Sequence, residues 1–389
     1  MSFNEDWKEV ELKDVAKYSD ERIDIEKLKL ENYISTSNML ANKNGVNEAE
    51  SLPKLNSATK YEENDILISN IRPYFKKIWF SNTSGGSSND VLIIKTKNGL
   101  IYERYLYYYL SQNHFFDYMM QGAKGTKMPR GDKSSIMKYK IKFPKDAKEQ
   151  KFIAGIFSTL DKKIENNNKM NKTLEEMAQA IYKSWFVDFE PFQDGKFVES
   201  ELGMIPNNIE LKPLKDFFSV KTGKKNANIA TDDGDYAFFT CSQGMRRTNV
   251  YSFDDTAILL AGNGDFNVKW YRGKFEAYQR TYVLIPNVTE LFSFLYYSID
   301  YFLDKLILGQ RGSVISYLTK GMVEELKIPI MKDENMFNDI IKRLNNINYL
   351  IEKNENENRT LKKLRDSLLP KLMSGEIRVP LDDNAKEVN

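Results

Sequence analysis

The stretch Phe152–Trp185, FIAGIFSTLDKKIENNNKMNKTLEEMAQAIYKSW, repeats a spacing of four and then three residues. Eight of the ten positions on this spacing are apolar and two are asparagine. The positions are Ile153, Phe157, Leu160, Ile164, Asn167, Asn171, Leu174, Ala178, Ile181 and Trp185. Such a seam is typical of a long helix that packs lengthwise against another helix.

The same seam returns 187 residues later, with both asparagines in the same slots. Its positions are Ile340, Leu344, Ile347, Ile351, Asn354, Asn358, Leu361, Arg365, Leu368 and Leu372. Only Arg365, which aligns with Ala178, interrupts the pattern. Shorter similarities flank the seams: Trp7–Asp14 with Ile209–Asp216, Tyr105–Tyr108 with Phe294–Tyr297, and Lys140–Pro144 with Leu326–Pro329. One heptad helix alone is more often a buried helix of a domain, but two matched copies favour a duplicated chain.

We therefore predict an α/β (α+β) fold with a pseudo-two-fold internal repeat. Two mixed, β-rich domains are joined by two long antiparallel helices that form a coiled-coil spacer. Helices of roughly 36–40 residues would be rods of about 55–60 Å. The predicted boundaries are 1–147 for the first domain, 148–190 for the first helix, 191–332 for a linker and the second domain, 333–377 for the second helix, and 378–389 for a C-terminal tail.

Within each globular segment, strands and one helix are predicted from apolar alternation. The expected strands are 65–69, 91–94 and 138–143, then 256–260 and 282–285. The expected helices are 101–120 and 289–308, each followed by a glycine-containing loop.

The four seam asparagines lie near the middle of the predicted helices. A buried asparagine costs stability but fixes the register of a helix pair. The alternative is that these side chains lie at a hydrated surface. Apolar residues outside the seam form a second stripe, which indicates either helices docked from another protein or packing against the globular domains. They are Phe152, Ile156, Met170, Met177, Tyr182, Phe186, Ile341, Leu364 and Leu369.

The 389 residues carry a formal charge of only +2, so a nucleic-acid surface must come from local clusters. There is one cysteine, Cys241, and one histidine, His114, which excludes an internal disulfide and a four-ligand Cys/His zinc site. We expect Cys241 to be an inert buried thiol and His114 to be structural. No signal peptide or membrane-length apolar run is present, and the expected location is the cytoplasm.

Basic residues gather at glycine-containing loops, at matching places in the two globular segments. Lys and Arg supply charge to phosphates, while Arg, Asn and Gln can bind base edges in bidentate fashion. A solvated surface is the alternative for any single loop. The candidate DNA-binding residues are Ser69, Asn70, Arg72, Lys124, Thr126, Lys127 and Arg130 in the first segment, and Asn263, Asn267, Lys269, Arg272, Gln279, Arg280, Gln310 and Arg311 in the second.

Catalytic motifs are missing from the sequence. None of the 11 prolines is adjacent to another, so there is no Asp/Asn-Pro-Pro-aromatic run of an amino-methyltransferase. No Gly-x-x-x-x-Gly-Lys-Ser/Thr phosphate loop is present either. We predict a non-catalytic chain with no metal or cofactor of its own.

Several runs resemble the DNA-specificity subunits of type I restriction–modification systems. These are Lys60–Tyr74, Gly125–Arg130, the Lys148–Gln150 start of the first long helix, and the Leu202–Pro206 junction. The resemblance implies that each domain is a target-recognition domain that reads half of a split site in double-stranded DNA. It also implies two methyltransferase (M) subunits and restriction (R) subunits as partners. S-adenosylmethionine, ATP and Mg²⁺ would then belong to those partners only.

Two other functions stay open at this point. One is a coiled-coil adaptor with two protein-binding domains, and the other is a stand-alone DNA-binding regulator. The salt dependence of binding to random duplex DNA separates a DNA reader from an adaptor, because electrostatic DNA binding weakens steeply as salt rises.

Overall fold

The computed structural model describes residues 6–97, 99–125, 127–231, 234–308 and 316–379. The chain forms two compact units: unit 1 comprises Met1–Glu165 and Asn358–Asn389, and unit 2 comprises Asn166–Glu357. Two long helices, α5 (Ala147–Phe186) and α8 (Glu334–Ser374), each contribute one half to each unit. In the described part of the chain, no helix combines the length and the apolar character needed to cross a membrane.

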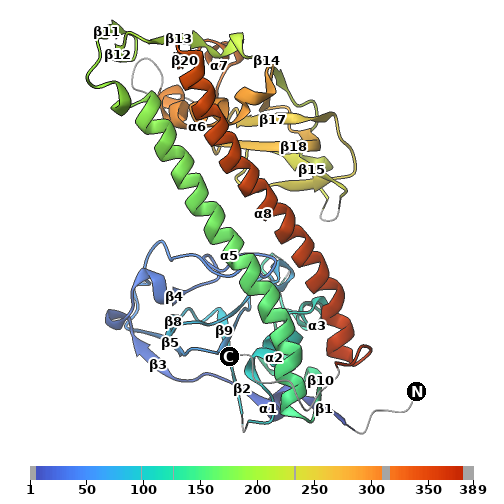
Figure 1. The fold of residues 1–389 in the computed structure, drawn as a ribbon. Coiled ribbons are helices and arrows are strands. Elements are labelled where there is room, and N and C mark those ends of the chain that lie inside the picture. Colours follow the sequence, from blue (N-terminus) through green and yellow to red (C-terminus); the bar gives the residue numbers. More distant parts are fainter. Residues whose placement is uncertain (1–5, 98, 126, 232–233, 309–315, 380–389) are drawn as a thin grey trace. The chain divides into compact units, whose positions relative to one another are not determined.

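Unit 1 is built around two four-stranded sheets and a two-stranded ribbon (Figure 1). The strand orders are β2–β9–β6–β7 and β3–β5–β8–β4, and β1 pairs with β10. The strands are β1 (Trp7–Glu11), β2 (Ala16–Tyr18), β3 (Arg22–Asp24), β4 (Tyr33–Ile34), β5 (Ser57–Tyr61), β6 (Ile66–Ser69), β7 (Ile78–Phe80), β8 (Gly85–Ser87), β9 (Val91–Thr96) and β10 (Lys140–Pro144). Its other helices are α1 (Leu12–Val15), α2 (Glu103–Leu110), α3 (Asn113–Gln121) and α4 (Lys133–Ile136), with 3₁₀ turns η1 (Ile25–Lys27), η2 (Leu30–Asn32) and η3 (Pro73–Phe75).

The single helix predicted over 101–120 is instead two helices, α2 and α3. Polar side chains end the first helix: the Ser111 hydroxyl donates to the Tyr107 carbonyl at 2.7 Å, and Gln112 Nε2 donates to the Tyr109 carbonyl at 3.1 Å. Gln112 has an extended backbone and precedes α3. Side chains that satisfy terminal carbonyls compete with continuation of a helix, which explains the break.

In unit 1, the two long helices pack against each other and against the domain. Ile153 and Phe157 of α5 share one hydrophobic core with Leu369 and Leu372 of α8 and with the aromatic faces of α2 and α3. Farther along α5, Asp161 Oδ1 accepts a hydrogen bond from Arg365 Nη1 at 2.8 Å. Residues later in α5 therefore pair with residues earlier in α8, so the two helices run antiparallel.

Unit 2 contains a six-stranded sheet of order β14–β19–β17–β18–β15–β16 and two ribbons, β11–β12 and β13–β20. The strands are β11 (Phe197–Ser200), β12 (Gly203–Pro206), β13 (Ile209–Pro213), β14 (Phe218–Thr222), β15 (Tyr236–Phe239), β16 (Arg246–Thr248), β17 (Phe253–Ala261), β18 (Val268–Ala277), β19 (Thr281–Pro286) and β20 (Lys327–Met331). Its other helices are α6 (Phe292–Leu308) and α7 (Lys320–Glu324), with 3₁₀ turns η4 (Glu190–Phe192), η5 (Leu214–Asp216), η6 (Ala227–Ile229) and η7 (Thr289–Leu291).

The second half of strand β17 is buried on both faces of the large sheet. Ile258 and Leu260 belong to the core that contains α6 and the long helices, whereas Ala257 and Leu259 face a second core with Phe275. Successive side chains of a strand point to opposite faces, so a run that is apolar at every position can fill two cores.

In unit 2, α5 and α8 also run antiparallel. Tyr182 and Phe186 share a core with Ile340 and Leu344. Toward the other end of this segment, Asn167 Nδ2 donates to Glu357 Oε2 at 2.8 Å.

Most predicted seam residues are buried. Those below a tenth exposed are Ile153, Phe157, Ile164, Asn167, Ala178, Ile340, Leu344, Ile347, Ile351, Asn358 and Leu372. Those of intermediate exposure are Leu160, Asn171, Leu174, Ile181, Trp185, Asn354, Leu361, Arg365 and Leu368.

The two units share a pattern of pairing. In unit 1 the first strand pairs antiparallel with the strand that precedes α5, and Trp7 lies opposite Pro144. In unit 2 the corresponding β13 pairs antiparallel with the strand that precedes α8, and Ile209 lies opposite Met331. Each long helix therefore follows a strand that is paired with an earlier strand of the same unit.

Candidate nucleic-acid interface

Three loops of unit 1 converge and are hydrogen-bonded to one another. They span residues 38–46, 69–77 and the described parts of the third loop, 122–125 and 127–132. The Asn42 and Lys43 amides donate to the Phe75 and Lys76 carbonyls at 2.8 and 3.0 Å, which ties the first loop to the second. The second loop is tied to the third by the Arg72 amide, which donates to the Pro129 carbonyl at 2.8 Å.

Left-handed backbone conformations concentrate in these loops. Asn42, Lys43, Arg72 and Lys76 have φ between 49° and 62°, although none is glycine. Such conformations are costly for side chains other than Asn and Asp, and they persist where the surroundings enforce them. Clusters of this strain often mark functional surfaces.

A polar network lies beneath the loops. Asn70 is buried, and its main-chain carbonyl accepts from the Gly131 amide at 3.2 Å. A Cβ at Gly131 would lie 2.8 Å from Asn70 Oδ1, so any other residue here would force the Asn70 side chain to move. Among the described residues, Asn70 Oδ1 and Arg72 Nε are buried without a hydrogen-bond partner. Unsatisfied buried polar atoms are rare and point to a ligand or a functional role.

The outer surface of the same loops is basic and aromatic. Tyr74 and Phe75 are 46% and 38% exposed, and their ring centroids lie 4.7 Å apart. Lys124 and Arg130 are exposed, and each forms an ion pair at the rim, with Asp132 at 3.4 Å and with Asp90 at 3.1 Å. Exposed pairs of this kind are weak and exchange readily for phosphate contacts.

The structure thus brings together six of the seven candidates from the first segment. Arg72, Lys124, Lys127 and Arg130 are accessible to differing degrees. Ser69 is buried, and its hydroxyl donates to the Ile71 carbonyl at 3.0 Å, so it shapes the turn. The seventh candidate, Thr126, lies outside the described residues.

In unit 2, candidates gather where β17, β18 and β19 meet. The Gly262 amide donates to the Arg280 carbonyl at 2.8 Å, which places the Asn263 turn beside Gln279 and Arg280. Gln279 and Arg280 are exposed and line a cavity of about 350 Å³ with Thr222. These residues form the candidate interface of unit 2.

Three other candidates of unit 2 have internal partners. Asn267 is buried, and its Nδ2 donates to the Cys241 carbonyl at 3.1 Å, while the Lys269 ammonium donates to the Ser242 carbonyl. Burial lowers the pKa of Lys269. Arg272 forms an ion pair with Glu352 of α8 at 3.5 Å. Gln310 and Arg311 lie outside the described residues.

The two unusual side chains of the sequence have local roles. The His114 ring contacts the Tyr139 hydroxyl through Nδ1, and burial lowers the pKa of this imidazole. Cys241 is half-buried rather than fully buried as predicted, with its Sγ 3.5 Å from the Arg280 carbonyl. Among the described residues, no group of His, Cys, Asp and Glu is arranged to hold a metal ion.

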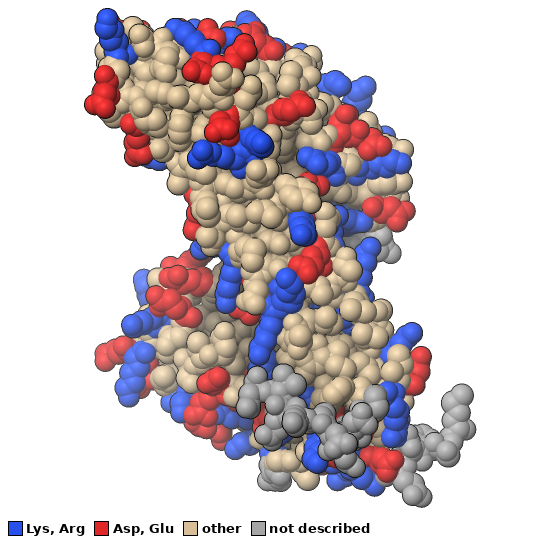
Figure 2. All heavy atoms as spheres, in the orientation of Figure 1, with Lys and Arg blue, Asp and Glu red and all other residues tan. Residues whose placement is uncertain are grey.

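Several residues of the interface were not among the sequence candidates. Asn42 and Lys43 belong to the polar run Ala41-Asn-Lys-Asn-Gly45, and Lys76 ends the 69–77 loop. The Asn-Gly pair signals a turn, but only the fold shows that this turn lies against the 69–77 loop. On the face drawn in Figure 2, basic and acidic side chains are interspersed.

Comparison with known proteins identifies the family. The profile described as the type I restriction modification DNA specificity domain matches residues 4–176 and again residues 206–363. The chain belongs to this family. The resemblance inferred from the sequence runs is thereby confirmed.

Curated relatives carry corresponding names. Over 181 residues the chain is 35% identical to the type I restriction enzyme EcoDI specificity subunit of Escherichia coli, a match that covers 45% of this chain and 40% of that one. Over 313 residues it is 28% identical to the MjaIX specificity subunit of Methanocaldococcus jannaschii, covering 73% and 71%. The chain thus aligns with less than half of the EcoDI subunit.

A solved structure shows the same fold. The type I restriction–modification S subunit from M. genitalium superposes with a TM-score of 0.59 at 15% identity, covering 96% of this chain and 98% of that one. The mixed α/β class predicted from the sequence is therefore confirmed.

Proposed function

We propose that this chain is the non-catalytic DNA-specificity subunit of a type I restriction–modification enzyme. Each unit contributes one target-recognition domain, and each domain reads one half of a bipartite site in double-stranded DNA. The observation that carries the proposal is the double match to the specificity-domain family. Each matched region also has exposed basic candidates on its loops, with Lys124, Lys127 and Arg130 in the first and Arg280 in the second. Membership in this family favours a DNA reader over a protein adaptor.

We further propose that α5 and α8 form a coiled-coil spacer between two repeated domains. The antiparallel contacts within each unit support this arrangement: Asp161 with Arg365 in unit 1, and Asn167 with Glu357 in unit 2. The 187-residue offset between the two seams supports the duplication. The spacer would set the gap between the two half-sites.

The partners are those that the family resemblance implies, and the apolar surface left on these helices supports them. Tyr182, Phe186, Ile341 and Leu369 of the second stripe are buried in the cores. In contrast, four others are exposed to between 43% and 52%: Phe152, Met170, Met177 and Leu364. Exposed apolar stripes on helices suit the docking of further helices. We assign this surface to two methyltransferase subunits, with restriction subunits completing the enzyme and S-adenosylmethionine, ATP and Mg²⁺ bound only by the partners, in the cytoplasm.

Mapping of methylated adenines by sequencing tests the proposal. Cells that carry this chain with its methyltransferase subunits should methylate a two-part motif with a constant gap. Cells that carry the methyltransferase subunits alone should lack this motif. Methylation at a continuous motif, or the same motif without this chain, would overturn the assignment.

A further inference from the structure

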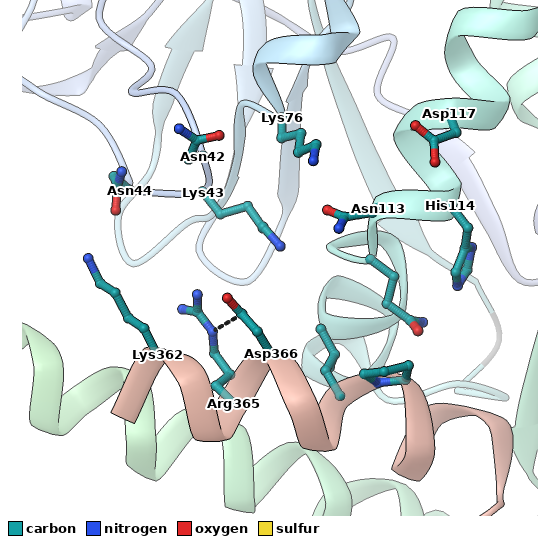
Figure 3. A pocket seen from close by; sticks show the side chains of 13 residues that line it. Asn42, Lys43, Asn44, Lys76, Asn113, His114, Asp117, Lys362, Arg365 and Asp366 are labelled. Atoms are coloured by element: carbon teal, nitrogen blue, oxygen red, sulfur yellow. Dashed lines mark hydrogen bonds and ion pairs between the residues drawn. The ribbon is translucent and has the colours of Figure 1, made fainter. Parts of the chain in front are cut away.

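A cavity of about 680 Å³ opens in unit 1 beside the candidate interface. Figure 3 shows its walls: α8 on one side, and the 42–44 loop, Lys76 and the start of α3 on the other. Lys43 and Lys76 extend from the loops and Lys362 from α8 into the space between them. We refer to this space as the lysine cleft.

The lining of the lysine cleft has more basic than acidic side chains: Lys43, Lys76, Lys362 and Arg365 against Asp117 and Asp366. Arg365 is neutralised, because its guanidinium bonds Asp161 at 2.8 Å and Asp366 at 3.1 Å. Lys43, Lys76 and Lys362 have no hydrogen bond or ion pair from their ammonium groups to any residue that the structure describes. Burial lowers the pKa of Lys43, with Arg365 and Lys76 contributing and Asp366 and Asp161 opposing. Keeping the Lys43 ammonium charged in this site therefore costs free energy, and a bound anion would offset that cost.

The backbone fixes two of these lysines in place. Lys43 and Lys76 have φ of 62° and 52°, and the Lys43 amide donates to the Lys76 carbonyl at 3.0 Å. Glycine or asparagine adopts this conformation more cheaply than lysine. The fold alone does not favour lysine at either position. We therefore attribute the two lysines to the positive charge that they bring to the cleft.

We propose that the lysine cleft binds backbone phosphates of duplex DNA, so that helix α8 contacts DNA together with the loops of unit 1. The inference rests on the proposed function. The cleft continues the candidate interface, because Lys76 ends the same loop that carries Asn70 and Arg72. Lysines meet phosphates as flexible point charges and read no sequence. The cleft therefore adds affinity and orientation, without base specificity.

Unit 2 carries a different residue at the matching helix position. The residue that aligns with Lys362 is Glu175, whose carboxylate accepts hydrogen bonds from Tyr296 and Tyr297 at 3.2 and 3.3 Å. An acidic group in this place would repel a phosphate. The helix contribution is therefore confined to the DNA beside the half-site of unit 1.

The test measures the salt dependence of binding to random duplex DNA by the full chain assembled with its methyltransferase subunits. The variants are the triple substitution Lys43→Gln, Lys76→Gln and Lys362→Gln, the same three positions changed to Arg, and Lys363→Gln as a neighbouring control outside the cleft. Thermal melting establishes that each variant is folded. A second arm measures whether inorganic phosphate raises the melting temperature.

The slope of log K against log salt is negative, and we expect its magnitude to decrease by roughly 2 to 3 in the triple Gln variant, since each phosphate contact contributes about 0.9. The Arg variant and Lys363→Gln should keep the wild-type slope. The preference for target over random DNA should not change. A wild-type slope in the triple Gln variant would overturn the lysine cleft while leaving the proposed function intact.

Two other outcomes would also overturn the assignment of the lysine cleft. If inorganic phosphate stabilises the wild type but not the triple variant, and the DNA slope is the same in both, the cleft is a small-anion site and the DNA assignment is wrong. If the wild type shows no salt-dependent DNA binding at all, both the proposed function and the cleft assignment fail.

Discussion

Asn171 Oδ1 on α5 accepts a hydrogen bond from Asn354 Nδ2 on α8 at 2.8 Å, inside unit 2. Asn171 Nδ2 also faces the Ile351 carbonyl at 3.4 Å. The Asn354 amide therefore finds an acceptor across a mostly apolar seam, and a shift of one helix along the other breaks this hydrogen bond. This is the behaviour expected of a polar residue that specifies register.

Replacing one member of this pair should destabilise unit 2. Asn171→Leu or Asn354→Leu leaves the other amide without its partner and should lower the free energy of unfolding by about 1–3 kcal/mol. The double Leu variant should recover most of the loss, because both polar groups are gone. Urea denaturation measures all three. Additive losses in the double variant would show that the pair is not coupled.

Arg365, the one break in the second seam, forms a partly buried charge network. Asp161 accepts from both Arg365 Nη1 and the Tyr108 hydroxyl at 2.8 Å, and the Arg365 side chain is 15% exposed. Arg365→Ala should therefore cost unit 1 about 1.5–3 kcal/mol, the range for a hydrogen bond to a charged group. Asp161→Ala with Arg365→Ala should cost less than the sum of the single losses. Lys363→Ala, on the exposed surface, should change stability by less than about 0.5 kcal/mol.

Recognition of the two half-sites should be separable. Arg130 belongs to the loop surface of unit 1 and Arg280 to that of unit 2. Arg130→Ala should weaken discrimination at one half-site by about 1–3 kcal/mol if it contacts a base, and Arg280→Ala at the other. Competition binding with duplexes altered in one half at a time measures this, and each variant is the control for the other. Equal losses at both halves would indicate global damage.

The gap between half-sites should follow the length of both helices. Insertion of four residues in α5 after Glu165, together with four in α8 after Glu357, adds about 6 Å to each helix. The antiparallel contacts within each unit are retained in this double insertion, so a longer gap should be methylated. Insertion in α5 alone breaks those contacts and should give an unstable chain. Methylome mapping that returns the original gap after the double insertion would rule out the spacer.

Glu175 should make the stability of unit 2 depend on pH. Burial raises the pKa of this carboxyl, with hydrogen bonds from Tyr296 and Tyr297 opposing the effect. The folded state therefore holds the proton to higher pH than the unfolded state, whose pKa is about 4.3. Stability is greatest below that value and falls as pH rises through the folded pKa.

Glu175→Gln removes this loss of stability at higher pH, since the amide oxygen can still accept hydrogen bonds from both tyrosine hydroxyls. The substitution should raise the free energy of unfolding more at pH 7 than at pH 4, as measured by urea denaturation. Glu176→Gln, an exposed neighbour, should show no such difference. An equal effect of Glu175→Gln at both pH values would contradict the assignment.

The sequence by itself determined the parts that depend on periodicity. Heptad spacing predicted the long helices, because each apolar position must be covered wherever the rest of the chain lies. Alternation and continuous apolar runs likewise predicted β6, β9, β10, β17 and β19 close to their observed bounds. The break between α2 and α3 escaped prediction, because it depends on side chains that bond carbonyls of the turn before them.

Only the tertiary structure decided which polar residues share a surface. Lys43, Lys76 and Lys362 are far apart in the sequence, and none stands out by its neighbours from the other 54 of the 57 Lys and Arg residues. Folding brings them to one cleft because main-chain bonds join the 42–44 loop to the 69–77 loop, and because the end of α8 packs into the core of unit 1. Contacts of this kind depend on three-dimensional distances, which no local pattern records.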